Sequence, residues 1–297
     1  MKIVVTGSLG HIGKPLTKEL VEKGYDVTVI SSKAERQKDI EALGAKAAIG
    51  RIEDVPFLTA AFSGADLVYT MIPPTDFRSS DYDLIALCRE LAGNFAEVVQ
   101  KAGIKRVVHL SSIGAHMEKN SGLILGHHSA EVILNELQDV NITYMRPTAF
   151  YYNLLAFLPV IKNAGVITSN YGGEDVVPWV SPIDIAAAIA EEVAAAPSHR
   201  KVRYVASEEL SCNEVASILG EAIGKPELKW TTISNEQMLA NITAFGMPKQ
   251  IAAAYVEMNA SMHSGELFED YYKNKPVFGK VNLKDFAKDF AIAYAQN

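Results

Sequence analysis

The sequence predicts an α/β protein with a doubly wound parallel sheet and a small, mainly helical C-terminal lobe. Short β-branched segments alternate with helix-length segments, several ending at glycine, a pattern typical of consecutive βαβ units. After residue 147 this alternation stops, and from residue 208 the chain is mainly helical with loops. We therefore expect a first domain over residues 1–150 and a lobe over residues 151–297. Segments near 176–206 are expected to return to the first domain.

The expected strands are short runs rich in valine and isoleucine, which suit the interior of a parallel sheet. They occupy residues 2–6, 25–31, 45–50, 65–72, 105–112, 141–147 and 201–207. The expected helices occupy residues 14–23, 34–44, 55–64, 82–102, 126–138 and 181–196. Residues 150–180 are expected to form a helix and an irregular hairpin.

Composition and charge exclude several classes of protein. The chain has 297 residues, 48% of them apolar, and is therefore long enough for a large buried core. Its net charge of -7 disfavours general nucleic-acid binding, because an acidic chain repels phosphate backbones. No apolar run reaches the length of a membrane span, and the short apolar start is needed as a strand, so we expect a cytoplasmic protein.

The two cysteines carry no recognisable metal or redox pattern. Cys88 and Cys212 lie far apart and outside any CxxC or Cys/His ligand spacing. We expect both to be reduced thiols, as is usual in a reducing compartment. The adjacent His127 and His128 lack a third ligand at a recognisable spacing, so no metal site is expected.

A glycine motif follows the first expected strand. Gly7, Gly10 and Gly13 form G-x-x-G-x-x-G between a strand and a helix, at the start of the βαβ series. This context predicts a Rossmann-type dinucleotide site, in which free N–H groups and the helix dipole hold a pyrophosphate. The expected contacts in this turn also include Ser8, Leu9, His11 and Ile12.

The end of the second expected strand favours NADP(H), with NAD(H) as the alternative. An NAD site usually carries an acidic residue there, which binds the ribose hydroxyls. This chain has Ser31, Ser32 and Lys33 at that place, with Arg36 one turn later. Hydroxyl and cationic groups suit a 2′-phosphate. The alternative for the two cations is a solvated helix start.

Further motifs resemble a known family. They are VVHLSSIGAH and a pattern formed by His127, Glu131, Tyr144, Arg146, Pro147, Phe150 and Asn153. Together with the glycine motif, they resemble the NmrA-like branch of the atypical short-chain dehydrogenase/reductases, and the resemblance covers essentially the whole chain. It implies a Rossmann domain with a small C-terminal lobe. The branch includes NADPH-dependent quinone and dye reductases, dinucleotide-binding redox sensors and a transcriptional regulator.

The usual acid–base pair of the larger superfamily is absent. Between Ser112 and Tyr144 there is no tyrosine, and the only lysine is Lys119, so the Tyr-x-x-x-Lys pair is missing. Its absence argues against sugar epimerases, dehydratases and ordinary carbonyl reductases. A quinone or cationic dye needs less proton transfer, so hydride transfer from NADPH to such an acceptor remains feasible.

The remaining candidate residues lie where the expected parallel strands end, since ligands bind at that edge of a sheet. His127 and Ser112 are the catalytic candidates, although each also suits a purely structural role. The expected cofactor contacts there are Met71, Ile72, Pro73, Ser111, Pro147 and Phe150, with Pro74 in the same loop. Tyr151, Tyr152 and Asn153 are the expected acceptor contacts, with ordinary packing as the alternative.

Three hypotheses follow from these observations. The first is an NADPH-dependent oxidoreductase that passes hydride to a quinone-like or other flat conjugated acceptor. The second is a non-catalytic NADP(H)-binding sensor that acts through protein partners, and the third is a reductase or isomerase with a family-specific acid. The expected partner of the enzyme is a small-molecule acceptor, with neither nucleic acid nor membrane involved. The chain is expected to be a monomer or a homodimer.

Overall fold

The computed structural model describes residues 1–73 and 83–296. Within these residues, a seven-stranded parallel sheet has the order β10-β6-β5-β4-β1-β2-β3. The strands are β1 (Lys2–Val5), β2 (Asp26–Ser31), β3 (Lys46–Ile49), β4 (Leu67–Met71), β5 (Arg106–Leu110), β6 (Asn141–Pro147) and β10 (Arg200–Val205). The chain winds outward in both directions from β1 and β4, which is the Rossmann arrangement. The predicted fold class is confirmed.

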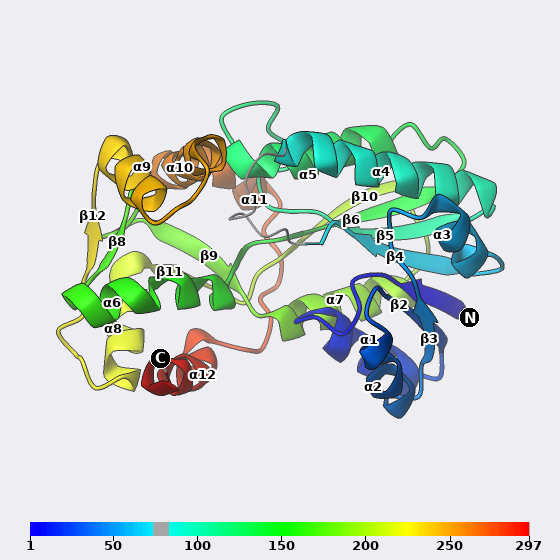
Figure 1. Ribbon diagram of the computed structural model, residues 1–297, viewed down its shortest axis with the longest axis horizontal. Coiled ribbons are helices and arrows are strands. Elements are labelled where there is room, and N and C mark those ends of the chain that lie inside the picture. Colours follow the sequence, from blue (N-terminus) through cyan, green and yellow to red (C-terminus); the bar gives the residue numbers. More distant parts are fainter. Residues whose placement is uncertain (74–82, 297) are drawn as a thin grey trace.

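Helices cover both faces of this sheet (Figure 1). One face carries α1 (Gly13–Glu22), η1 (Ala34–Arg36), α2 (Gln37–Ala42) and α7 (Pro182–Ala194). The other carries α3 (Val55–Phe62), α4 (Leu84–Lys101) and α5 (Leu125–Leu134), whereas η2 (Gly122–Ile124), just before α5, packs against the core of the lobe. Each layer buries its own apolar cluster against the strands. The predicted start of α4 at Tyr82 lies outside the described residues.

The lobe is built from short strands and helices around a separate aromatic core that includes Trp179 and Trp230. Its strands are β7 (Ala149–Phe150), β8 (Ile167–Ser169), β9 (Val176–Val180), β11 (Glu208–Ser211) and β12 (Trp230–Thr232). Its helices are η3 (Tyr151–Phe157), α6 (Leu158–Ala164), α8 (Cys212–Ala222), α9 (Asn235–Ala244), α10 (Lys249–Ser264), η4 (Glu266–Phe268), α11 (Glu269–Lys273) and α12 (Leu283–Gln296).

The expected hairpin within residues 150–180 is wrong. β8 pairs with β12, and β9 pairs with β7 and β11, so the two strands of this region do not pair with each other. Their partners come from distant parts of the chain, which no local turn pattern reveals.

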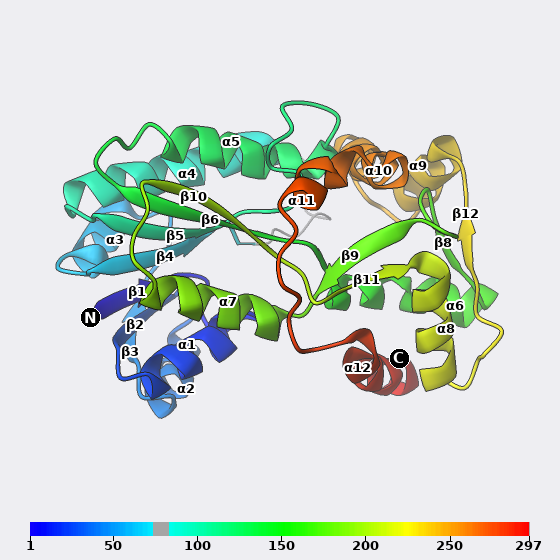
Figure 2. The same ribbon diagram turned by 180° about the vertical axis from the view of Figure 1, so that it is seen from behind.

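The chain passes between the two halves of the molecule more than once. α7 and β10 lie on the main sheet, although β9 before them and β11 after them belong to the lobe. Residues 274–282 then run across the junction towards α12, as Figure 2 shows. Both cysteines are free and buried. In the described part of the chain, no helix combines the length and apolar character needed to cross a bilayer.

Candidate functional site

The glycine turn is pinned to the neighbouring strand. Gly7 and Ser8 both have left-handed backbones, with φ of 88° and 55°. The Ser8 N–H donates to the carbonyl of Ile30 at 3.1 Å, and the Ser8 hydroxyl donates to the Ser31 hydroxyl at 2.9 Å. Leu9 and Ile12 turn towards the core of the same face. The turn is therefore held in one shape before any ligand arrives.

The three glycines of the motif differ in what surrounds them. A Cβ at Gly13 would lie 2.0 Å from the Ser8 carbonyl oxygen, and one at Gly7 would lie 2.3 Å from the Met71 sulfur. At Gly10, the nearest atom to such a Cβ is the Gly7 carbonyl oxygen at 3.5 Å, an ordinary contact. Gly13 is thus required by close packing against backbone, and Gly7 by its left-handed φ of 88°. Gly10 instead keeps a stretch of backbone bare at the exposed side of the turn.

The start of α1 is suited to an anion. Ile12 is the N-cap residue, with no side-chain hydrogen bond to the helix, and the first turn contains no acidic residue. The first N–H groups of a helix have no partner within it, and the helix dipole adds positive potential there. The turn and this helix start therefore form a recognisable phosphate-binding geometry.

The residues at the end of β2 differ in burial: one is buried and shapes the turn, and the others are exposed. Ser31 is buried, and its hydroxyl accepts a hydrogen bond from the Lys33 N–H at 3.2 Å, so it shapes the turn from inside. Ser32, Lys33 and Arg36 are exposed, and Arg36 lies 3.4 Å from Asp39.

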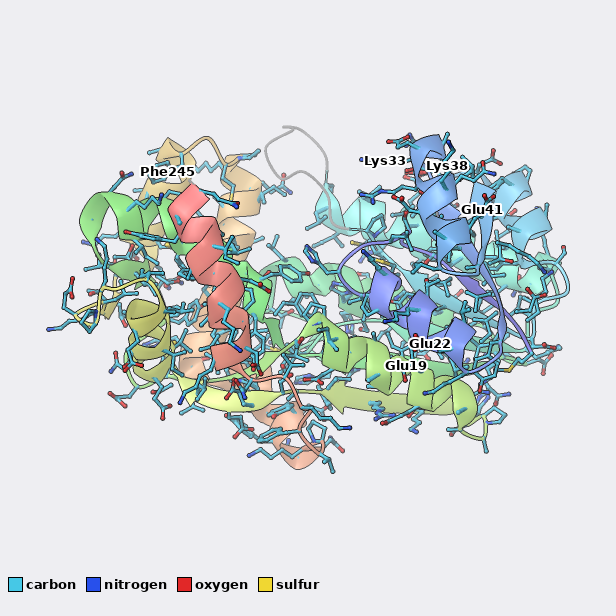
Figure 3. The ribbon with its side chains drawn as sticks, turned by 90° about the horizontal axis from the view of Figure 1, so that it is seen from below. Glu19, Glu22, Lys33, Lys38, Glu41 and Phe245 are labelled. Carbon is cyan, nitrogen blue, oxygen red and sulfur yellow. The ribbon has the colours of Figure 1, made fainter. Side chains whose placement is uncertain are left out.

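Charged side chains of both signs lie at this end of the sheet, since Glu35 and Asp39 are exposed beside the cations. In Figure 3, Lys33 and Lys38 project from the same region, whereas Glu41 lies further along α2. Glu19 and Glu22 lie on α1, away from the two lysines. Lys38 was not among the residues predicted from the sequence, although its position two residues after Arg36 was a signal for it. The exposed cations suit the 2′-phosphate predicted there.

The ends of β4 and β6 lie beside the turn. Met71, Ile72 and Pro73 are half-buried, and the Met71 N–H donates to the Thr6 hydroxyl at 3.1 Å. Pro147 is buried at the end of β6, and its carbonyl accepts from the Ile113 N–H at 2.9 Å. Pro74 lies outside the described residues. These strand ends meet at one edge because the strands are parallel.

A buried charge network joins the main sheet to the lobe. Glu131 on α5 accepts hydrogen bonds from Arg146 Nη2 at 2.7 Å and from the Ser111 hydroxyl at 2.5 Å. Arg146 also donates to Asp270 of α11 at 3.2 Å and to Tyr204 at 3.2 Å. Burial alone would lower the pKa of Arg146, but the ion pair with Glu131 outweighs it and raises that pKa. This network explains why Glu131 and Arg146 occur together in the sequence pattern.

This network also places Ser111, an expected cofactor contact. The side chain is buried, and its hydroxyl is engaged with Glu131. Ser112, the next residue, is half-buried. The pair at the end of β5 is therefore divided, with Ser111 directed inward and Ser112 the more accessible of the two.

His127 lies one helical turn before Glu131. The residue is half-buried overall, and its Nδ1 is buried with no hydrogen-bond partner among the described residues. Burial lowers the pKa of His127 below its ordinary value of 6.5, although the Glu131 carboxylate opposes this effect. The ring is therefore mostly uncharged at neutral pH. The Nδ1 of the adjacent His128 lies 3.0 Å from the Ala115 carbonyl oxygen.

The residues of the segment after β6, Tyr151 to Asn153, lie in two different environments. Tyr152 is half-buried, and Asn153 is exposed. Tyr151 is almost fully buried, and its hydroxyl donates to Glu208 at 2.6 Å. Its ring stacks with Trp179 and Phe286, so it packs inside the lobe, where no acceptor would reach it without rearrangement. Tyr152 and Asn153 are the accessible members of this predicted acceptor group.

A further ring contact joins the aromatic segment to the glycine turn. The Tyr152 ring stacks on that of His11, with centroids 4.6 Å apart and an interplanar angle of 21°. Phe150 lies on Tyr152 at 5.1 Å and packs against the core of the main sheet. The start of the lobe thus reaches the glycine turn. No group of three or more histidine, cysteine, aspartate or glutamate residues in the described ranges is arranged to hold a metal.

Comparison with known proteins identifies the family. The model of the NmrA-like family matches residues 1–277. The chain belongs to the NmrA-like family. An NAD(P)H azoreductase from Xenophilus azovorans is 28% identical over 262 residues, covering 87% of this chain and 86% of the relative.

Two solved structures share the fold. The NADPH-dependent quinone oxidoreductase QOR2 of Escherichia coli, complexed with NADPH, has a TM-score of 0.80 and 19% identity. The match covers 97% of this chain and 99% of that one. The triphenylmethane reductase of Citrobacter sp. has a TM-score of 0.78 and 19% identity, covering 98% of this chain and 100% of that one. The whole described chain, lobe included, therefore has a known architectural counterpart.

Proposed function

We propose that this chain is an NADPH-dependent oxidoreductase that transfers a hydride to a quinone-like or other flat conjugated acceptor. The observation that carries the proposal is the glycine turn, with its uncapped helix start beside the exposed cations Lys33 and Arg36. This arrangement suits a pyrophosphate and a 2′-phosphate in one extended ligand. The azoreductase and quinone oxidoreductase relatives support the same class of reaction.

The protein's part in the reaction is binding and orientation. The bound nicotinamide would supply the hydride, and the turn together with the ends of β4 and β6 would hold the dinucleotide. Tyr152 and Asn153 are the proposed acceptor contacts because they are the accessible residues of the aromatic segment. A flat acceptor gains from stacking on an aromatic ring, whereas a bulky aliphatic one does not.

His127 fits a hydrogen-bonding role better than a proton-supplying one. Its imidazole is held mostly uncharged at neutral pH by burial. A neutral imidazole can still donate a hydrogen bond to a developing oxyanion. The reduced acceptor would then take its proton from solvent, which suits quinones because their reduced anions are stabilised by conjugation.

The direct test measures NADPH oxidation with the purified full chain and a panel of quinones, azo dyes and cationic dyes. NADH is run in parallel. Saturable turnover that prefers NADPH is the expected result. Tight NADPH binding without turnover on any acceptor would instead favour a dinucleotide-binding sensor, a hypothesis supported by the lack of a Tyr-x-x-x-Lys pair between Ser112 and Tyr144. Failure to bind either nucleotide would refute both functions.

Cofactor preference has its own test in the variant Lys33→Ser/Arg36→Ser. Loss of charge-assisted bonds to a 2′-phosphate should weaken NADPH binding by about 10- to 100-fold, with little change for NADH. Lys18→Ser is the control, because Lys18 is exposed on α1 and pairs only with Glu22. Equal losses for NADPH and NADH would place the 2′-phosphate elsewhere.

A further inference from the structure

His11 is the only ionisable side chain in the glycine turn, residues 7–13. It lies between Gly10, where the backbone is bare, and Ile12, which is buried. The His11 side chain is exposed, and none of the described residues forms a hydrogen bond or ion pair with it. The imidazole therefore lies beside the proposed phosphate site with its hydrogen-bonding capacity unused.

Tyr152 restrains this imidazole. The two rings are nearly parallel, at 21°, with centroids 4.6 Å apart. Tyr152 is itself backed by Phe150 at 5.1 Å, and Phe150 belongs to β7, which pairs with β9. Burial raises the pKa of Tyr152 to about 12, so the phenol stays neutral and does not compete with an anion for the imidazole. The stack fixes the plane of His11 but leaves both ring nitrogens without a partner.

We propose that His11 binds the pyrophosphate of the dinucleotide and that Tyr152 is the positioning residue that holds the imidazole over the turn. The inference rests on the proposed function, since it assigns one ligand group to that same site. The imidazole N–H and the backbone N–H groups at the start of α1 would donate hydrogen bonds to the same pyrophosphate. Because the ring is already oriented, less entropy is lost when the anion binds. The first residues of the lobe thereby complete the cofactor site of the Rossmann domain.

Two ligands separate this role from general effects on the site. NADPH carries both the pyrophosphate and the 2′-phosphate, whereas 2′-AMP carries only the latter. Calorimetric titration of the full chain with each ligand should show that His11→Ala weakens NADPH binding about tenfold and leaves 2′-AMP binding unchanged. His11→Gln retains an N–H donor and should lose less.

Variants of Tyr152 distinguish stacking from a role of its hydroxyl. Tyr152→Ala should weaken NADPH binding as His11→Ala does, while Tyr152→Phe keeps the ring and should restore the wild-type affinity. If the two side chains act together, the double variant His11→Ala/Tyr152→Ala should lose no more than either single variant. Thermal melts of each variant confirm that the fold is retained.

Several outcomes would overturn the inference. Unchanged NADPH affinity in His11→Ala, or equal losses for NADPH and 2′-AMP, would remove the pyrophosphate contact. A Tyr152→Phe variant as weak as Tyr152→Ala would replace the stacking role with one for the hydroxyl. Wild-type chain that binds neither ligand would refute the proposed function itself, which is a result distinct from a selective effect of His11.

Discussion

Single residues of the glycine motif differ sharply in the reason for their identity. Gly13 is the first residue of α1, and its lack of a Cβ makes room for the Ser8 carbonyl oxygen. Gly93, in the middle of α4, has nothing within 4 Å of the position a Cβ would take. The same substitution is therefore expected to have opposite effects at the two glycines.

Gly13→Ala should disrupt the turn, because a backbone oxygen 2.0 Å from the new Cβ cannot move without shifting the turn itself. We expect NADPH binding to be lost and the melting temperature to fall. Gly93→Ala should stabilise the fold by about 0.5–1 kcal/mol through helix propensity. Nucleotide titration and thermal unfolding of both variants measure these effects. A Gly13→Ala variant with wild-type affinity would contradict the assignment of the turn.

At the scale of elements, the edge strand β10 is held to the main sheet by charges on α7. The buried Glu192 carboxylate accepts hydrogen bonds from Lys201 Nζ at 2.7 Å and Arg203 Nη1 at 2.9 Å. Burial alone would raise the pKa of Glu192, but these two cations outweigh it and lower the pKa below 4.5. The ionised form is thus favoured by folding.

The sign of the pH effect follows from this lowered pKa. Stability contributed by Glu192 is fully present above about pH 4.5 and is lost as the pH falls through the lower, folded-state pKa. Glu192→Gln should reduce the free energy of unfolding by about 1–3 kcal/mol at neutral pH. Denaturant titrations at several pH values should show this deficit shrinking on acidification. Glu191→Gln is the control, since that side chain is 65% exposed. A deficit independent of pH would contradict the charge argument.

Some strands can be predicted from the local sequence pattern, and others cannot. The expected strands of the main sheet agree with the structure to within a few residues, because most are buried runs rich in β-branched residues, although β3 has no fully buried residue. β8 is only three residues long, and β9, although as long as β4 and β5, contains Pro178; both strands obtain their partners from segments that are distant in the chain. The expected hairpin failed for that reason.

At the scale of the whole molecule, residues 274–282 connect α11 to α12 and are hydrogen-bonded to α7 where they cross between the two halves. Asp184 on α7 accepts hydrogen bonds from the N–H groups of Lys280 and Val281, each at 3.0 Å, and from the Ser207 hydroxyl at 2.6 Å. A Cβ at Gly279 would lie 2.2 Å from the Asp184 carboxylate, so the crossing segment packs directly on it.

Asp184→Ala should leave these buried donors without an acceptor and lower the free energy of unfolding by roughly 2–4 kcal/mol. Amide hydrogen exchange should be faster at Lys280 and Val281, which separates a local release from a general loss of stability. The control is Asp285→Ala, because Asp285 is half-exposed at the start of α12. Unchanged hydrogen exchange at the Lys280 and Val281 amides would contradict the proposed role of Asp184 in holding this segment in place.

The candidate site was predicted in part from local spacing. The glycine turn, the serine and lysine residues after β2 and the strand ends each follow from a pattern of adjacent residues. The direction of a side chain at a strand end does not, since it depends on what packs opposite. Ser111 turns towards Glu131, and Tyr151 turns into the lobe core, for reasons supplied by α5 and α12.

The sequence by itself determined the Rossmann sheet and the position of the glycine turn, and it predicted a dinucleotide site there, because those features depend on the order and spacing of neighbouring residues. Tertiary structure alone decided that Arg146 bridges Glu131 and Asp270, that Tyr152 stacks on His11, and that Asp184 fastens the segment before α12. Apart from the local Glu131 pair, these contacts join residues 97 to 141 positions apart. Such partners are selected by packing of the whole chain, and no local periodicity encodes them.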